Sequence, residues 1–287
     1  MGAGAYQFNY ADEQSLLDAI NNKTLFDNPE QFVITHGNNA TFAQEYPRFE
    51  YEQLSLYVQD NINLSNNFKL SAGIRFELPF YPSLDFNYNK KVCDATFAEV
   101  NGNGGKYDTR QLPKARLSIS PRIGFNWDIM GDRKYVLRGG TGIFVGRMPF
   151  VWIVAQAGDA GVLQTTVTRT KDQGVPTISN NRNEILGQLY PNGFSAVEAG
   201  QNINSITLID SNLRNPMAWK SSLAFDAVLP GEILASVEGI YNKDMYPASM
   251  TNIGLKSPTK IEGGRAYYNN GYYDSQIQKA YLVSNVT

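Results

Sequence analysis

The 287-residue sequence is poor in cysteine, histidine and charged residues. Its single cysteine, Cys93, excludes an internal disulfide, and the single histidine, His36, lies too far from it in the sequence to match a zinc-ligand spacing. Charged residues make up 18%, with Lys plus Arg at 25 and Asp plus Glu at 27. This low and balanced charge argues against a nucleic-acid partner. We therefore expect no metal, no cofactor and no nucleic acid.

Long hydrophobic runs are also lacking. No stretch reaches the roughly 18 apolar residues that a membrane-spanning helix needs, and the mean hydropathy is -0.34. A helical membrane protein is thereby excluded. Aromatic and turn residues are abundant instead, with 17 Tyr, 15 Phe and 25 Gly. A membrane β-barrel stays open, because strands that alternate lipid-facing and lumen-facing side chains have a mildly polar average.

Alternation of apolar and polar residues predicts three β-hairpins, as Leu54, Ser55 and Leu56 illustrate. Their strands are expected at 51–63 with 68–77, 115–129 with 134–146, and 215–229 with 233–244. These strands are longer than the five or six residues usual in globular proteins. Their length suits a tilted membrane crossing.

The connections between the predicted strands differ in length. Turns within hairpins fall at 64–67, 130–133 and 229–232, whereas segments rich in Gly, Pro and Asn separate the hairpins at 78–114 and 147–214. Residues 1–50 are expected as a loop region, and 246–287 as further loop with one possible strand. Short turns on one side and long loops on the other are typical of outer-membrane barrels. We predict an all-β fold: a segment of an antiparallel up-and-down transmembrane β-barrel with long extracellular loops.

Each predicted strand has an apolar face and a polar face. The apolar faces, expected to meet lipid, carry Leu54, Leu56, Val58, Ile119, Ile123 and Phe125. The polar faces, expected to line the lumen, carry Arg75, Glu77, Arg116, Arg122, Arg138, Lys220 and Glu238. Aromatic residues expected to form interfacial girdles are Tyr51, Tyr57, Trp127, Tyr135, Trp219 and Tyr241.

Several of these segments resemble a known family. Residues 57–60 (YVQD) followed by 70–75 (LSAGIR) resemble a strand pair in the barrels of TonB-dependent receptors, and 120–127 with 137–144 resemble the next hairpin. Residues 146–153 and 215–220 are similar to the Oar-like branch common in Bacteroidetes, whose members carry a carboxypeptidase-regulatory-like domain before the plug. The resemblance covers most of 45–260.

The resemblance implies a receptor of the Gram-negative cell outer membrane, with a barrel of about 22 strands. An N-terminal plug fills such barrels, and the TonB complex drives uptake of a scarce small ligand, glycan or peptide. Some Oar-like members are associated with export. We find no plug, no TonB box and no terminal aromatic residue, and six strands are too few to close that barrel. The sequence is therefore expected to be a fragment, with the plug region and its TonB contact missing.

Aromatic residues in the two long loops are candidate ligand contacts, because rings stack on sugars, peptides and siderophores. They are Tyr81, Tyr88, Tyr107, Phe150, Trp152 and Tyr190. Loop aromatics can equally pack the loops against each other, and Phe150 and Trp152, which follow a strand closely, could anchor a loop at the rim.

Two other function classes, a soluble binding module and a hydrolase, are alternatives to the outer-membrane receptor. A soluble all-β surface module for carbohydrate or peptide would explain the aromatic content, but its greasy strand faces would need a second layer to cover them. A β-rich hydrolase needs converging titratable groups, and nothing near His36 resembles a nucleophile elbow. The glycines at 139–146 lie inside a strand, unlike a phosphate-binding loop. We expect no catalytic residues and no enzyme activity.

Overall fold

The computed structural model describes residues 6–22, 29–39, 41–43, 45–98, 105–177, 179–195, 203, 205–274, 277 and 279–286. Its largest element is a six-stranded antiparallel sheet, called the wall from here on, with strand order β10-β9-β6-β5-β4-β3. The strands are β3 (Glu52–Asn63), β4 (Phe68–Phe80), β5 (Ser118–Asp128), β6 (Tyr135–Val145), β9 (Met217–Leu229) and β10 (Ile233–Asp244). The antiparallel up-and-down arrangement predicted from the sequence is confirmed.

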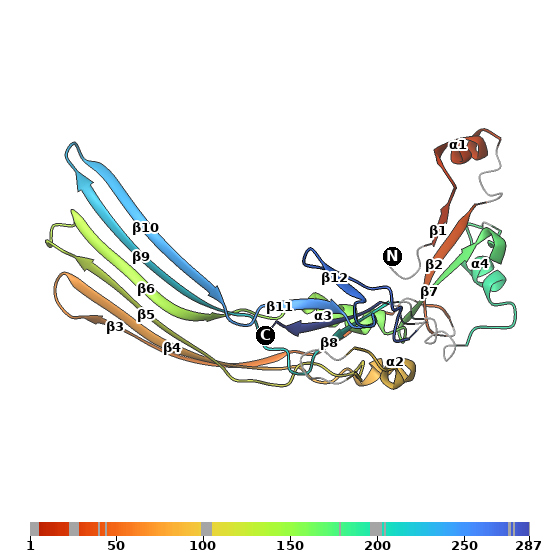
Figure 1. Cartoon of the computed structure of the whole chain (residues 1–287), viewed down its shortest axis with the longest axis horizontal. Helices are drawn as coiled ribbons and strands as arrows, with labels where there is room; N and C mark the ends of the chain where they lie inside the picture. The colour runs from red at the N-terminus through yellow and green to blue at the C-terminus, as the bar shows by residue number, and fades with distance from the viewer. Residues whose placement is uncertain are drawn as a thin grey trace.

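The six wall strands occur in the sheet in the order in which they occur along the chain, although β7 and β8 lie between β6 and β9 in the sequence. The three short turns lie at one end (Figure 1). β3 runs toward these turns, and β10 runs away from them. In the middle turn, the Asp128 carboxylate accepts hydrogen bonds from the backbone N–H of Gly131 (3.0 Å) and Arg133 (3.1 Å). Gly131 has φ of 81°, a conformation that glycine adopts without strain. The wall is open, with β3 and β10 at its edges.

The strand register separates the two kinds of side chain. Ile74 of β4 lies opposite Val58 and Pro121, whereas Arg75 lies opposite Tyr57 and Ser120. Because successive residues point to opposite sides of a strand, these rows define an apolar face and a polar face. No described element covers the outer strands of the apolar face, where Leu54, Val58 and Val237 are 66%, 62% and 75% exposed.

Several residues depart from this division, among them Leu234 and Ile240 of β10, which share the polar face with Ser236 and Glu238. Tyr57, predicted for an aromatic girdle, lies opposite Arg75 on the polar face, so that prediction is wrong. Its position in the two-residue alternation sets its side, whatever its side-chain type. Asp60 lies opposite Ala72 and therefore falls on the apolar face, between Val58 and Ile62 near the turns.

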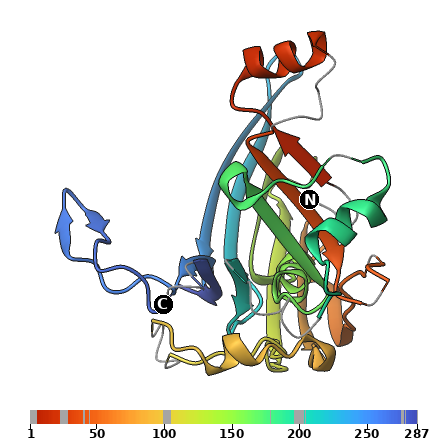
Figure 2. The ribbon, with the colours of Figure 1, turned by 90° about the vertical axis from the view of Figure 1, so that its right-hand side faces the viewer.

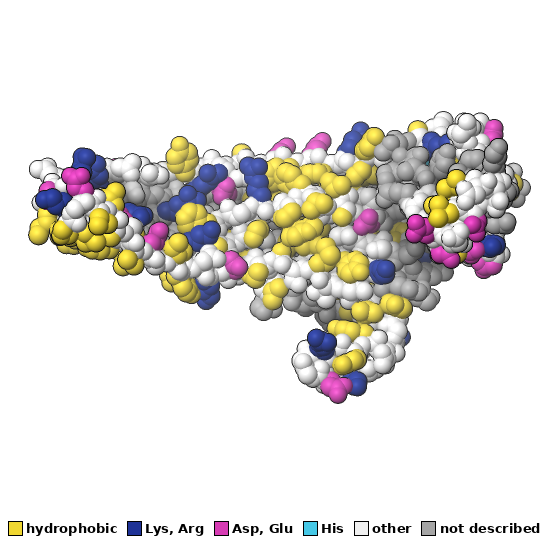
Figure 3. All heavy atoms as spheres, turned by 90° about the horizontal axis from the view of Figure 1, so that it is seen from above, with side chains coloured by type: hydrophobic (Ala, Val, Ile, Leu, Met, Phe, Trp, Pro, Cys, Tyr) yellow, Lys and Arg dark blue, Asp and Glu magenta, His cyan; other side chains and the backbone are white. Residues whose placement is uncertain are grey.

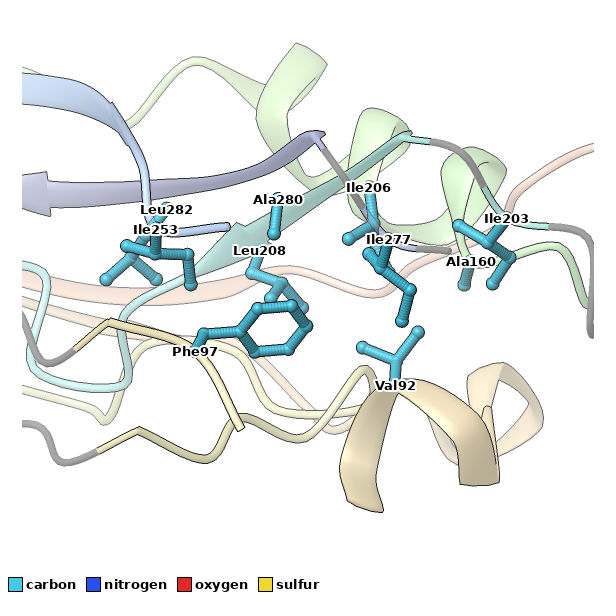
Figure 4. Close-up of a cluster of buried hydrophobic side chains, with 10 residues drawn as sticks. All are labelled: Val92, Phe97, Ala160, Ile203, Ile206, Leu208, Ile253, Ile277, Ala280 and Leu282. Atoms are coloured by element: carbon cyan, nitrogen blue, oxygen red, sulfur yellow. The ribbon is translucent and has the colours of Figure 1, made fainter. Parts of the chain in front are cut away.

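The far end of the wall joins a folded region, which we call the cap (Figure 1). It contains η1 (Asp85–Asn87), α2 (Lys90–Asp94), α3 (Phe150–Asp159), β8 (Ser205–Ile209), β11 (Ala248–Asn252) and β14 (Lys279–Asn285). β14 pairs with β11 antiparallel and with β8 parallel. Figure 4 shows a buried cluster in the cap, where Phe97 and Val92 meet Leu208 and Ile277. The cap has its own hydrophobic core.

A smaller sheet lies beyond the cap, with strand order β1-β2-β7 (Figure 2). We call it, with its helices, the distal sheet: β1 (Tyr6–Asn9), α1 (Glu13–Asn21), β2 (Gln31–Gly37), β7 (Gln164–Thr170), η2 (Lys171–Gln173) and α4 (Arg182–Leu189). A separate hairpin, β12 (Lys260–Glu262) with β13 (Arg265–Tyr267), projects from the body. No helix among the described residues is long and apolar enough to cross a membrane.

The segments expected as loops therefore contain several short helices and strands. Residues 1–50 hold β1, α1 and β2, residues 78–114 begin with the end of β4 and hold η1 and α2, and 147–214 hold α3, β7, η2, α4 and β8. Residues 246–287 hold β11 to β14, against one possible strand expected. Elements of three to ten residues are too short to produce the sustained period on which the sequence prediction depended.

Candidate functional site

The polar face of the wall contains a cavity of about 620 Å³, which we call the hollow. Its lining includes Gly73, Gly124 and Gly140 on three adjacent strands, together with cationic and hydroxyl side chains. Because these three positions lack side chains, the backbone forms the floor and the longer side chains stand around it. In Figure 3, Lys and Arg side chains gather over the part of the molecule that the wall forms.

Two arginines on the polar face are paired with carboxylates. Arg75 Nη2 lies 2.8 Å from Glu77 Oε1, which also accepts a hydrogen bond from Gln53 Nε2 at 2.7 Å. Arg138 Nε lies 2.9 Å from Asp226 Oδ2, and its Nη1 lies 3.9 Å from Glu238 Oε1. The Arg75–Glu77 pair lies within β4, whereas Arg138 of β6 reaches across to β9 and β10. Both sets of contacts neutralise charge beside the hollow.

The middle of the hollow keeps its positive charge. Arg122 and Lys220 approach the ring of Phe144, with cation-to-centroid distances of 4.5 and 5.7 Å. Within the described part of the chain, no carboxylate lies within 4.0 Å of either cation. Two cations therefore share one aromatic ring in the hollow.

Aromatic side chains bracket the apolar face near both ends of the strands. Near the turns, Phe68 lies beside Phe125 and Trp127, with centroid separations of 6.0 and 6.4 Å. Toward the cap, Trp219 and Tyr241 meet edge to face at 5.5 Å. Aromatic belts around an aliphatic band are typical of a surface that crosses a membrane with its ends at the two interfaces.

A family model described as an outer membrane beta barrel domain matches residues 2–281. The chain belongs to this family. Comparisons with curated proteins and with solved structures give no match. The protein is thus an outer-membrane β-barrel protein, located in the cell outer membrane of a Gram-negative bacterium. In membrane β-barrels of this kind, strand faces that meet lipid are apolar and faces that line the lumen are polar.

The residues predicted to line the lumen fall into two groups, those within the strands of the wall and one that lies before the start of β5. The register places six of them on the polar face of the wall: Arg75, Glu77, Arg122, Arg138, Lys220 and Glu238. Arg116 was expected in a strand beginning at 115, but β5 begins at Ser118. The guanidinium of Arg116 donates to Asn212 Oδ1 at 2.9 Å, so this residue joins the wall to the cap.

The six loop aromatics do not converge on one site. Tyr81, Phe150 and Trp152 pack against the buried cluster around α3. Tyr107 packs against the cluster in Figure 4, and Tyr190 against the core of the distal sheet. Tyr88 is 47% exposed, with the Arg110 guanidinium 4.6 Å from its ring centroid. Of the six, Tyr88 presents the most accessible ring.

Tyr81 lies where the barrel wall meets the cap. Burial raises the pKa of its hydroxyl to about 12, so the group stays protonated at neutral pH. The hydroxyl donates to Asn215 Oδ1 at 3.4 Å, and its ring lies 5.2 Å from that of Tyr51. Tyr81 therefore holds the ends of β4 and β9 together at the junction.

A buried glutamine links the two long connections of the barrel. Gln156 of α3 donates through Nε2 to the carbonyl oxygens of Thr109 and Gln111, both at 2.9 Å. Its Oε1 accepts from the N–H of Ile209 at 2.7 Å. One side chain thus satisfies two backbone carbonyls of the segment 109–111 and one N–H of β8, which joins these parts of the cap.

His36 is fully buried in the distal sheet, in an aromatic box that the sequence did not reveal. Its ring meets Phe42, Tyr190 and Phe194 edge to face, at centroid separations of 5.1 to 5.4 Å. Nδ1 lies 2.9 Å from the Gly37 carbonyl and Nε2 lies 2.7 Å from the Tyr190 hydroxyl. A neutral ring that donates through Nδ1 and accepts at Nε2 satisfies both contacts.

Burial lowers the pKa of His36 and keeps its ring neutral, which suits a packing role. No cluster of three or more His, Cys, Asp or Glu side chains able to hold a metal ion occurs in the ranges that the structure describes. The ring contacts join β2 to residues after α4, which no local sequence pattern could have indicated.

Proposed function

We propose that this protein is part of the barrel of a TonB-dependent receptor that moves a scarce ligand across the outer membrane, without catalysing a reaction. The observation that carries the proposal is the construction of the wall. The apolar face of the wall has aromatic side chains near both ends of its strands, and the polar face contains the charged hollow. The long connections fold into a cap at one end of the wall. A transporter needs a wall of this kind beside its path.

Four of the segments that resemble the receptor family, 57–60, 70–75, 120–127 and 137–144, lie together in the wall. Gln59 of the YVQD segment lies opposite Gly73 of the LSAGIR segment, and Gly73 lies opposite Arg122 of the next hairpin. Gly140, from the segment 137–144, contributes to the floor of the hollow. The motif glycines keep the lumen side free of side chains, which supports a path or a docking surface there.

The proposal includes partners. A plug domain, acting with the TonB complex, would supply the energy for uptake, and the ligand is a small molecule, glycan or peptide. For contact with the ligand outside the lumen we propose Tyr88, whose ring is accessible and whose neighbour Arg110 is held by Asp108 through two short contacts of 2.6 and 3.0 Å. Of the remaining candidate aromatics, Tyr190 packs in the distal sheet and the other four pack in the cap.

Growth of matched strains tests this function. Deleting the gene should slow growth on one scarce nutrient among iron complexes, cobalamin, glycans and peptides, and deleting TonB should produce the same defect with no further loss in the double deletion. A protonophore should abolish the corresponding uptake of labelled nutrient. Uptake that depends on the gene but is indifferent to TonB and to the protonophore would contradict the proposal.

A further inference from the structure

Two buried polar atoms in the hollow lack a hydrogen-bond partner among the described residues. The Ser120 hydroxyl is one, in a residue only 1% exposed, and the Nε of Arg75 is the other. Ser120 and Arg75 lie opposite each other on β5 and β4 and both line the hollow. A buried donor without an acceptor costs free energy, so this pair favours a group that brings acceptor oxygens to it.

The charge around this pair has the sign that such a group requires. The lining of the hollow contains three cations, Arg75, Arg122 and Lys220, and one carboxylate, Glu238. Glu238 faces Arg138, and Arg75 has one nitrogen on Glu77, so Arg122 and Lys220 stay without a carboxylate partner among the described residues. An anion entering the hollow would meet two unneutralised cations.

The register keeps these two cations close together. Gly142 lies directly opposite Arg122 on one side and opposite Lys220 on the other, so no side chain separates them in that row. Both also approach Phe144, which lies two residues further along β6. The ring limits where each cation can lie without consuming its hydrogen-bond donors, which remain available to oxygen atoms.

We propose that the hollow binds the carboxylate or phosphate group of an anionic solute, with Arg122 and Lys220 supplying the charge and Ser120 and Arg75 supplying hydrogen bonds. This assignment deepens the proposed function by giving the ligand a chemical class. A volume of about 620 Å³ accommodates a small polyanion. Charge-assisted hydrogen bonds from Arg to carboxylate or phosphate are among the strongest that side chains make.

Titration calorimetry of the full chain in a neutral detergent, at low ionic strength, tests the proposal. The probes are citrate and inorganic phosphate, so that the preferred probe distinguishes carboxylate from phosphate. Arg122→Gln, Lys220→Gln and Ser120→Ala should each weaken binding of the preferred anion, by about tenfold for the cations and severalfold for the hydroxyl. Lys220→Arg keeps the charge and should keep most of the affinity.

Lys69→Gln is the matched control, because Lys69 is an exposed cation of β4 that lies on the polar face of the wall but outside the hollow. It should leave binding unchanged. Failure of the wild-type protein to bind either anion, or equal weakening by Lys69→Gln, would overturn the proposal. If a Glu-rich peptide binds but citrate and phosphate do not, the hollow is a site for an acidic protein segment, and the proposal of an anionic solute is overturned.

The two proposals fail separately. Normal TonB-dependent uptake by a protein whose hollow binds no anion would count against the hollow alone. Anion binding that follows the expected order of variants, in a protein whose gene deletion leaves uptake unchanged, would count against the receptor alone.

Discussion

Replacing Ile123 by arginine tests which side of the wall meets lipid. Ile123 is 48% exposed on the apolar face and lies at the centre of β5, an eleven-residue strand. At a rise of about 3.3 Å per residue and a tilt of about 45°, the strand spans about 25 Å along the membrane normal, the height of the apolar band in outer-membrane barrels. Ile123 therefore sits near the midplane, where a lipid-facing arginine costs about 2–4 kcal/mol.

The matched substitution is Asn126→Arg, three residues along the same strand and on the polar face. Lumen solvent would hydrate this arginine, so its remaining cost is repulsion from Lys69 and Arg138, which lie directly opposite position 126, at a few tenths of a kcal/mol to about 1 kcal/mol. Urea titration of the protein in phospholipid vesicles, followed by tryptophan fluorescence, measures both. The folding constant should fall about 30- to 900-fold for Ile123→Arg. Equal losses for both variants, or a neutral Ile123→Arg, would refute the assignment of the faces.

Three further predictions concern the cap, the distal sheet and the wall. Gln156→Ala leaves the Gln111 carbonyl and the Ile209 N–H without their partner, at about 1–3 kcal/mol each, so hydrogen exchange at Ile209 should accelerate strongly; unchanged exchange would contradict the linking role. His36 has a lowered folded-state pKa against 6.5 for the free side chain, so the stability of the distal sheet should be full above about pH 6.5 and fall as the pH drops below it. Thermal unfolding at about pH 8 and about pH 5 measures this, and His36→Phe should flatten the difference. Gly142→Ala places a Cβ 2.9 Å from both Pro121 O and Arg122 Cγ and should cost about 1–3 kcal/mol in chemical unfolding, whereas Gly239→Ala, with open space around it, should be nearly neutral.

The wall was predictable from sequence because its signal repeats over many residues. Eleven to thirteen alternating positions per strand identify a strand and its greasy side without any knowledge of partners. The bounds of β10 agree with the expected 233–244, and those of β3 and β9 differ by one or two residues. β5 begins three residues later than expected, because Arg116 turns to Asn212 in the cap. Local pattern fails where a tertiary contact ends the strand.

The cap was not predictable for the opposite reason. The five residues of β8 gain their structure from β14, which lies about seventy positions further along the chain and runs parallel to it. A parallel pair has no hairpin turn to indicate it in the sequence. Within the candidate site, alternation correctly placed the charges of the hollow on one polar face. The unpartnered Ser120 hydroxyl could not be predicted, because a serine in an alternating strand looks like any other polar position.

The opposite directions of the two edge strands restrict how the sheet can become a ring. β3 leads from the cap to the turns, and β10 leads back from the turns to the cap. Suppose that every pair of neighbouring strands in the closed ring is antiparallel. The additional strands that close the ring must then begin with one that runs from the cap to the turns beside β10 and end with one that runs from the turns to the cap beside β3. The number of additional strands is then zero or even, so a closed cylinder built on this sheet has even parity, whichever polypeptide provides the rest.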